Sequence, residues 1–570
     1  MLVFACFIYA FWFFVHPESL SYHEQYQLFL FSCDYLVSRL SVAGGVCDYL
    51  SEFIVQFYYC PAFGALLLTA VFVLLQMSLW KAARLLGASE SSFVFSFLPS
   101  LLILAYMGDE NVLLSFPLAL VVVLLTFCAS FYCYKWIHFF IIPLLYWIAG
   151  PVVVVYVILL ASHFILEKNY AYCIGIVPYA LASIYLLSHI FLVQYPWPDV
   201  WGGINYHRNR LTYPILQFVI EAVVAILPIA MHFVYNITNK WVCLCEYFTV
   251  FISGVLFVCF NYDKDKYYQI KCDYLVRYEQ WNDIIENAEH YQSATLMSAN
   301  SVNLALAKTG QLGERMFEFY QCGPKGLFSE FDRNMVACLP IAEAFYHLGM
   351  VNSAMRYYFD LQESILNGRK SGRMTKRLAE LNIVNGRYDV AQKYINDLKM
   401  SLFYSQWARD AERCLLSEDS VNNDVCFGRL RRLRYKSDFL YSSAEMSKML
   451  ALLWNQNKDN TMAFDYMMAN IMLECDMQSF VSAVPWLEVV HGDAMPRHYQ
   501  EVFAMFWLQN IHVDGYELSE QMKREVKKFD AFFLLSNDID KLRRSKWSKS
   551  YWTYCMLHRF STSVYNGSNY

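Results

Sequence analysis

The first half of this chain contains very little charge. Of the 45 Lys/Arg and 50 Asp/Glu residues in the 570-residue sequence, residues 1–262 carry 8 and 12, and residues 263–570 carry the other 37 and 38. Charge-free runs such as 61–79 and 112–133 are long enough for a helix to cross roughly 30 Å of hydrocarbon. Two halves of such different polarity do not share one core. We therefore predict an all-α protein, with a multi-span membrane domain at 1–262 and a soluble helical domain at 263–570.

Other features are missing as well, and each absence excludes a class of protein. A net charge of −5 is divided as about −4 and −1 between the halves, so neither half is basic enough to predict nucleic-acid binding. The 17 cysteines include no CxxC, and no metal-ligand spacing surrounds Cys243 and Cys245, which predicts buried thiols without a metal or cofactor. Residues 1–15 lack a basic start and a small-x-small cleavage site, so we predict an uncleaved first span.

Apolar segments recur along the whole membrane domain. We predict spans near 1–16, 60–80, 93–107, 112–133, 136–149, 151–166, 170–193, 214–236 and 241–261.

The connection between the first two spans is not a simple loop. Over 20–57, apolar side chains recur at helical spacing on both sides of Gly44-Gly45, while Glu24, Asp34, Asp48 and Glu52 provide polar faces. This pattern predicts two amphipathic helices that lie in the membrane interface rather than a spanning hairpin.

The number of spans depends on residues 136–166. As one helix they would be about 46 Å long, whereas Pro143 and Gly150-Pro151 favour a break into two short spans. Nine spans place the soluble domain outside the cytoplasm, and eight place it inside. Lys and Arg in the connections divide five to three in either case, so they do not decide. We favour nine spans and an extracytoplasmic domain.

A motif recurs in the soluble half. Gly310, Gly349 and Gly386 are spaced by 39 and 37 residues, and each is followed two residues later by Leu312, Val351 or Tyr388. The pattern resembles the tetratricopeptide-type helix–turn–helix repeat, most clearly over 273–400. This resemblance implies a helical solenoid whose groove binds a protein partner. An irregular helical domain is the alternative.

Acidic residues after the first span and between the third and fourth spans are candidates for catalysis. Glu24 begins the first connection, and Asp109 and Glu110 occupy a tight Gly-Asp-Glu-Asn turn. The layout of about 1–170 resembles the GT-C type of membrane glycosyltransferase. There, a carboxylate serves as base for the acceptor and the donor is a polyprenyl-phosphate sugar. The acid pair common in the first loop of that family is absent here. The alternative is that these acids are solvated turn residues.

Two further groups of polar residues belong to the membrane domain. His207, Arg208 and Arg210, in a Trp-rich connection, are candidates to bind the phosphate of a lipid-linked ligand, although they also fit simple charge bias. His189 and Glu221 are predicted within spans, where an ionisable side chain is costly unless it is paired or wet. A structural hydrogen-bonded pair, or snorkelling of His189, would explain them equally well.

The segments HEQYQLFLFSCDYL and GGVCDYLSEFIVQFYY, at 23–59, resemble an uncharacterised bacterial family with a multi-span region and a helical-repeat tail. This resemblance implies the bacterial inner membrane and no established activity. We predict a membrane-bound scaffold, in contact with lipid, whose repeats bind envelope proteins. The alternative is a GT-C-like glycosyltransferase that takes a polyprenyl-phosphate sugar, and a transporter is the third possibility.

Overall fold

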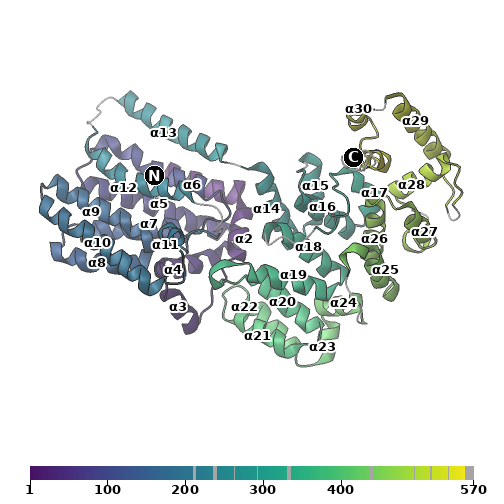
Figure 1. Cartoon of the computed structure of the whole chain (residues 1–570), viewed down its shortest axis with the longest axis horizontal. Coiled ribbons are helices and arrows are strands. Elements are labelled where there is room, and N and C mark those ends of the chain that lie inside the picture. The colour runs from purple at the N-terminus through teal and green to yellow at the C-terminus, as the bar shows by residue number, and fades with distance from the viewer. Residues whose placement is uncertain are drawn as a thin grey trace, which may run out of the picture. The chain divides into compact units, whose positions relative to one another are not determined.

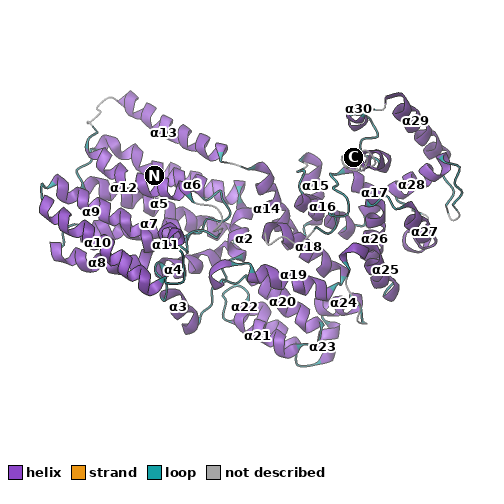
Figure 2. Ribbon diagram, viewed as in Figure 1, coloured by secondary structure: helices purple, strands orange, loops and turns teal. Residues whose placement is uncertain are grey.

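The chain is helical throughout the part that its structure, a computed structural model, describes (Figures 1 and 2). That part comprises residues 1–208, 214–234, 240–261, 263–291, 293–329, 335–436, 442–492, 494–513, 516–536 and 538–558. Within these ranges there is no β-strand, only two isolated β-bridges. The predicted all-α class is confirmed.

The helices divide into two compact units. The first contains 1–264, 365–376 and 393–411, and the second contains 265–364, 377–392 and 412–570. The boundary at 264 lies close to the predicted one at 262. Two segments from the half that we predicted to be soluble nevertheless group with the first unit, and they divide α20 (Gly372–Val384), α21 (Tyr388–Lys399) and α22 (Ser405–Cys414) between the units.

Each apolar segment of the first unit forms a helix. A π-helical turn extends the first helix to Val15, and a 3₁₀ segment, 90–97, leads into the sixth. The helices of residues 1–264 are α1 (Leu2–Ala10), α2 (Pro17–Gln25), α3 (Cys33–Leu40), α4 (Gly45–Val55), α5 (Pro61–Leu85), α6 (Leu98–Tyr106), α7 (Ser115–Ser130), α8 (His138–Ala149), α9 (Val153–Leu166), α10 (Tyr170–Phe191), α11 (Trp197–Gly202), α12 (Ile215–His232) and α13 (Lys240–Phe260).

Length and composition qualify several of these helices as membrane spans. Four helical stretches are long and apolar enough, namely 61–85, 135–166, 170–191 and 215–232. The count reaches six if the bent pairs 2–25 and 244–277 each form one span. Two shorter apolar helices, 90–106 and 115–130, pack with them. The first unit is therefore a polytopic helical membrane domain.

The stretch 135–166 turns back on itself. Lys135 Nζ lies 5.2 Å from the ring centre of Phe164, and His138 Nδ1 lies 2.7 Å from the Tyr156 hydroxyl. A straight helix would separate residues 135 and 164 by about 43 Å. The reversal occurs at Gly150, where φ is +61°, a conformation that favours glycine. α8 and α9 are thus antiparallel, as the Gly-Pro break predicted.

Alternate connections meet at one face of the first unit, which we call the loop face: α2–α4, the connections 107–114 and 192–208, and the turn at Gly150. There, Gly44 N donates to Trp147 O at 2.9 Å, Leu113 N donates to Tyr206 O at 2.9 Å, and the Tyr206 hydroxyl donates to Ala149 O.

The intervening connections meet at the opposite face. His232 Nδ1 lies 2.7 Å from Leu86 O, and the Tyr172 hydroxyl donates to Lys135 O at 2.6 Å. α13 runs parallel to α6, because Trp241 lines a cavity with Phe93 near the start of each segment while Gly254 packs on Leu101 further along. Since α6 ends at the loop face and α13 runs parallel to it, α13 ends at the loop face as well.

The backbone before α3 differs from the prediction. Helical spacing predicted a helix from Leu28, but α3 begins at Cys33, with Ser32 as its N-cap. Leu28 N donates instead to Lys370 O at 2.9 Å, and Phe31 N donates to Met400 O at 2.8 Å. The prediction was wrong over 28–32 because the backbone partners lie more than 340 residues away in the sequence.

The second unit consists of helical pairs, and its three predicted turn glycines all have positive φ: +70° at Gly310, +85° at Gly349 and +73° at Gly386. Leu306, Phe345 and Tyr358 are buried, and Trp281 is half-buried. The type of repeat stays a prediction. The helices after α13, apart from α20–α22, are α14 (Lys264–Arg277), α15 (Trp281–His290), α16 (Leu296–Lys308), α17 (Leu312–Arg315), α18 (Met335–Leu348), α19 (Val351–Glu363), α23 (Glu418–Asn423), α24 (Val425–Leu433), α25 (Met446–Gln456), α26 (Thr461–Leu473), α27 (Met477–His491), α28 (Arg497–Leu508), α29 (Glu520–Ser536) and α30 (Ile539–Arg543).

Candidate functional site

α2 places polar side chains inside the first unit, at the loop face. Pro17 starts this helix at its first position, where a missing N–H costs nothing. All of residues 19–25 are buried, including His23 and Glu24. A buried run of this polarity requires polar partners from neighbouring segments.

Two connections of the first unit approach α2. The backbones around Val112 and His207 form an antiparallel bridge, and Arg208 N donates to Asn111 O at 2.9 Å. Gly203, at φ +80°, permits the tight turn that precedes His207, because a Cβ there would lie 2.3 Å from the ring of Tyr206. The predicted acidic turn and the predicted basic connection are therefore held side by side.

Asp109 and His207 lie within ion-pair distance of each other at this bridge. His207 Nε2 lies 3.2 Å from Asp109 Oδ2, with the His side chain 8% exposed and the Asp side chain 37% exposed. The other carboxylate oxygen, Oδ1, accepts hydrogen bonds from Asn111 N at 2.9 Å and from Asn111 Nδ2 at 3.0 Å. Asp109 is thus oriented by its neighbours and remains accessible from outside the protein.

Arg208 is held against aromatic rings of α2. Its guanidinium carbon lies 4.3 Å from the ring centre of Tyr26 and 5.1 Å from that of Tyr22, which favours the cation. Its Nε and Nη2 atoms are buried and, among the described residues, have no hydrogen-bond partner. The pKa of His23 is lowered to about 3, chiefly by burial, and the charge of Arg208 also lowers this pKa whereas that of Asp109 raises it. A guanidinium with unused donors, held in this way, suits an oxyanion.

Glu24 lies on α2 and is more deeply buried than Asp109. It is 4% exposed, and its Oε1 accepts a hydrogen bond from the Tyr404 hydroxyl at 2.9 Å. Next to it, Gln25 Oε1 accepts from Arg373 Nη1 at 2.9 Å. We call His23, Glu24, Asp109, His207 and Arg208 the α2 cluster. Four of its five members were predicted from the sequence, and the structure gathers them from three separate segments.

The other predicted site residues have local partners or lie elsewhere. Glu110 Oε1 accepts from Asn111 Nδ2 at 3.1 Å within the turn. Glu221 Oε1 accepts from Gln217 Nε2 at 3.0 Å, and Gln217 also donates to Gly202 O. His189 contacts Tyr185 and Trp197 near the end of α10. Arg210 lies outside the described residues.

A second charged group on the loop face is fully enclosed, and we call it the acid anchor. Arg369 Nε donates to Glu52 Oε1 at 2.8 Å and its Nη2 contacts Asp48, while Arg39 Nε donates to Glu52 Oε2 at 2.9 Å. The side chains of Arg369, Asp48 and Glu52 are at most 2% exposed. Burial raises the pKa of Asp48 to about 6, although the charge of Arg369 opposes this rise. These three side chains are closed to solvent and paired with one another, so we interpret the acid anchor as structural.

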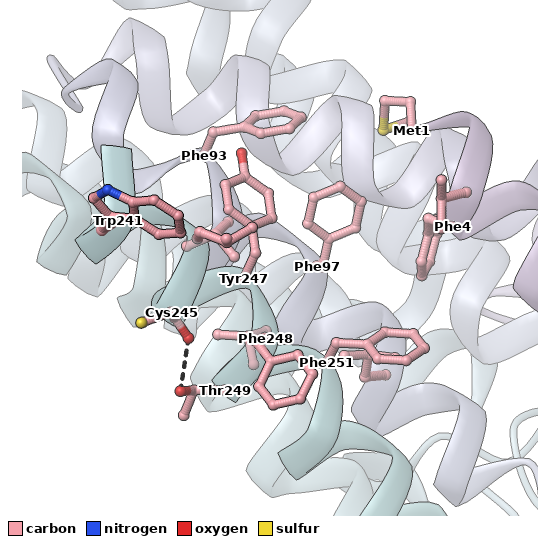
Figure 3. Close-up of a pocket in the computed structure, with 15 residues that line it drawn as sticks. Met1, Phe4, Phe93, Phe97, Trp241, Cys245, Tyr247, Phe248, Thr249 and Phe251 are labelled. Atoms are coloured by element: carbon pink, nitrogen blue, oxygen red, sulfur yellow. Dashed lines mark hydrogen bonds between the residues drawn. The ribbon is translucent and has the colours of Figure 1, made fainter. Parts of the chain in front are cut away.

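An apolar cavity of about 860 Å³ lies away from both groups (Figure 3). Aromatic side chains from the segments containing α1, α6 and α13 line it, including Phe4, Phe97, Trp241 and Phe251. None of its lining residues belongs to the α2 cluster. Among the described residues there is also no group of three or more His, Cys, Asp or Glu side chains that could hold a metal ion.

Comparison with known proteins identifies a family. One family model matches residues 1–558, and its description is "Family of unknown function (DUF6057)". The chain belongs to this family. No curated protein and no solved structure matches it. The family description provides no activity, so a function for this DUF6057 member has to come from the geometry.

Sequence reasoning missed several residues of the DUF6057 chain that contact the α2 cluster or belong to the acid anchor. Tyr22 and Tyr26 flank predicted residues on α2, and their helical spacing could have placed them on one face. Tyr404 and Arg369 left no such signal, because each contacts a residue more than 300 positions away. Only the folded chain brings them to the loop face.

Proposed function

We propose that the α2 cluster is the active site of a membrane glycosyltransferase that takes its sugar from a polyprenyl-phosphate donor. The observation that carries this proposal is the pairing of Asp109 with His207 beside Arg208. These residues place an oriented, accessible carboxylate against His207, whose neighbour Arg208 has two donor nitrogens without a hydrogen-bond partner among the described residues. A transfer from a sugar phosphate needs both, a base for the acceptor and a cation for the phosphate.

The proposed reaction assigns one role to each group. The oxygen of an acceptor hydroxyl attacks the anomeric carbon of the sugar and gives its proton to the carboxylate of Asp109. The bond between that carbon and the phosphate oxygen breaks, and its electron pair leaves with polyprenyl phosphate. Arg208 binds the phosphate as its charge increases, and His207 orients Asp109. Glu24, which is buried against Tyr404, positions α2 instead of meeting the acceptor.

The proposal includes a direction across the membrane, with the loop face outside the cytoplasm. In the sequence, five basic residues fall in connections of the opposite face and three in those of the loop face. Four more follow α13, but large domains translocate despite such charges. The opposite-face residues are Lys81, Arg84, Lys135, Lys168 and Lys240. Arg39 and Arg208 lie at the loop face, and Arg210 belongs to the same connection as Arg208 in the sequence.

The test uses the purified full chain in detergent with decaprenyl-phosphate-linked mannose or glucose as probe, and release of decaprenyl phosphate as readout. Asp109→Asn should fold normally and lower the rate by roughly 10²-fold or more. Asp199→Asn, in the same connection as His207 but outside the α2 cluster, is the matched control and should retain the rate. Equal rates for the wild type and Asp109→Asn would reject the assignment of the base.

A scaffold for envelope proteins is the second candidate. The positive-φ turn glycines, 39 and 37 residues apart in the helical second unit, favour it, because stacked hairpins form grooves that bind protein partners. Such a scaffold would keep its cellular function in a double variant, Glu24→Gln with Asp109→Asn. The glycosyltransferase proposed above would lose it.

A further inference from the structure

Two cysteines of the second unit lie almost within bonding distance of each other. Cys475 Sγ and Cys555 Sγ are 3.5 Å apart, although 80 residues separate them in the sequence. A disulfide bond is about 2.05 Å long, so a shift of about 1.5 Å would join the two sulfurs. The sequence contains no CxxC, and cysteine spacing therefore gave no indication of this pair.

The surrounding contacts hold the two sulfurs in place. Cys475 occupies the turn between α26 and α27, and Cys555 lies on the helical segment 551–558. The Tyr551 hydroxyl donates to Met472 O at 3.1 Å, and the Tyr554 hydroxyl donates to Leu473 O at 2.8 Å. These bonds fasten the helical segment to the last turn of α26, directly beside Cys475. The proximity of the sulfurs is therefore part of a defined packing arrangement.

We infer that Cys475 and Cys555 form a disulfide that fastens the segment 551–558 to the end of α26. The oxidant is a disulfide of a protein or of a small molecule. The thiolate of Cys475, which is half-buried, attacks one oxidant sulfur and releases the first thiol. The thiolate of Cys555, which is 2% exposed, then attacks Cys475 Sγ and releases the second thiol. Two protein thiols become one disulfide as the oxidant is reduced to two thiols.

The location of the second unit bears on this inference. Disulfides persist outside the cytoplasm and are rare within it. α13 ends at the loop face, and the two cysteines follow it in the sequence. If the loop face is outside the cytoplasm, the pair is on the side of the membrane where such oxidants act. The link would close a loop of about 80 residues around α27–α30, and cross-links of that length restrict the unfolded chain strongly.

The test uses the full chain expressed in bacteria, with thiols blocked by N-ethylmaleimide under denaturing conditions before digestion and mass spectrometry. We expect a peptide pair joined through Cys475 and Cys555, which disappears on reduction. In Cys475→Ser and in Cys555→Ser, the remaining cysteine should carry the maleimide. Cys414→Ser, at another half-buried thiol, is the matched control and should leave the link intact.

A second arm treats the purified chain, in detergent, with oxidised glutathione before blocking. A link between Cys475 and Cys555 in cells, or after this treatment alone, supports the pair as a disulfide site. Maleimide on both cysteines in both arms would overturn the inference. A link of either one to Cys322 would also overturn it.

Discussion

At the scale of single residues, the turn glycines of the second unit differ in what surrounds them. A Cβ at Gly349 would lie 2.6 Å from Leu433 Cβ and 2.9 Å from the Leu433 carbonyl carbon, whereas no atom lies within 4 Å of a Cβ at Gly386. Both glycines have positive φ, so an L residue at either position would have a strained backbone. Only at Gly349 would the added side chain also clash with a neighbour, Leu433.

This difference gives a matched pair of variants. Gly349→Ala should lower the free energy of unfolding by about 3 kcal/mol, because the strain of about 1–2 kcal/mol adds to the cost of overpacking. Gly386→Ala should lower it by only about 1–2 kcal/mol. Thermal midpoints of the two full-length variants in detergent compare the effects, and a smaller loss for Gly349→Ala would contradict the packing of this turn.

The contribution of the acid anchor to stability can also be tested with single substitutions. Arg369→Met should destabilise the first unit by about 3–5 kcal/mol, because it leaves the buried carboxylates of Asp48 and Glu52 with Arg39 alone. Arg356→Met is the control, since Arg356 is 75% exposed and its pair with Asp360 is expected to contribute little. The readout is the fraction of monodisperse protein after heating, and equal losses for both variants would show that the acid anchor is not structural.

At the scale of elements, the apolar stretches were predictable because they depend only on local composition. Each of the nine predicted spans corresponds to a helix within a few residues. The extended segment before α3 was not predictable, because its backbone bonds reach Lys370 and Met400. The same holds for the candidate site: residue type singled out Glu24, Asp109, His207 and Arg208 as candidates, whereas the contact of Tyr404 with Glu24 is visible only in the folded chain.

The number of membrane crossings depends on the chain reversal between α8 and α9 at Gly150. In a chain without native cysteines, Lys135→Cys with Phe164→Cys should cross-link with a short bifunctional maleimide, because α8 and α9 bring these positions together. Lys135→Cys with Leu144→Cys, about 14 Å apart along one helix, is the control and should cross-link poorly. Failure of the first pair would mean one continuous helix and an even number of crossings.

At the scale of the whole molecule, nine alternating helices would put the α2 cluster and the start of the C-terminal half on one side of the membrane. The apolar runs established a membrane protein, but charge counts alone left its sidedness open. If α8 and α9 each cross the membrane, the reversal at Gly150 favours an odd number of crossings. Both the proposed transfer reaction and the proposed disulfide need that side to be outside the cytoplasm.

Native cysteines on the two faces allow the most direct test. Cys33, on α3 at the loop face, and Cys133, in the opposite connection between α7 and α8, are both exposed. In full-length chains that keep only one of them, an impermeant maleimide is applied to intact spheroplasts and then to permeabilised ones. We predict that Cys33 reacts in intact spheroplasts and that Cys133 reacts only after permeabilisation. Labelling of Cys133 but not Cys33 in intact spheroplasts would contradict the account, since it would place the α2 cluster in the cytoplasm.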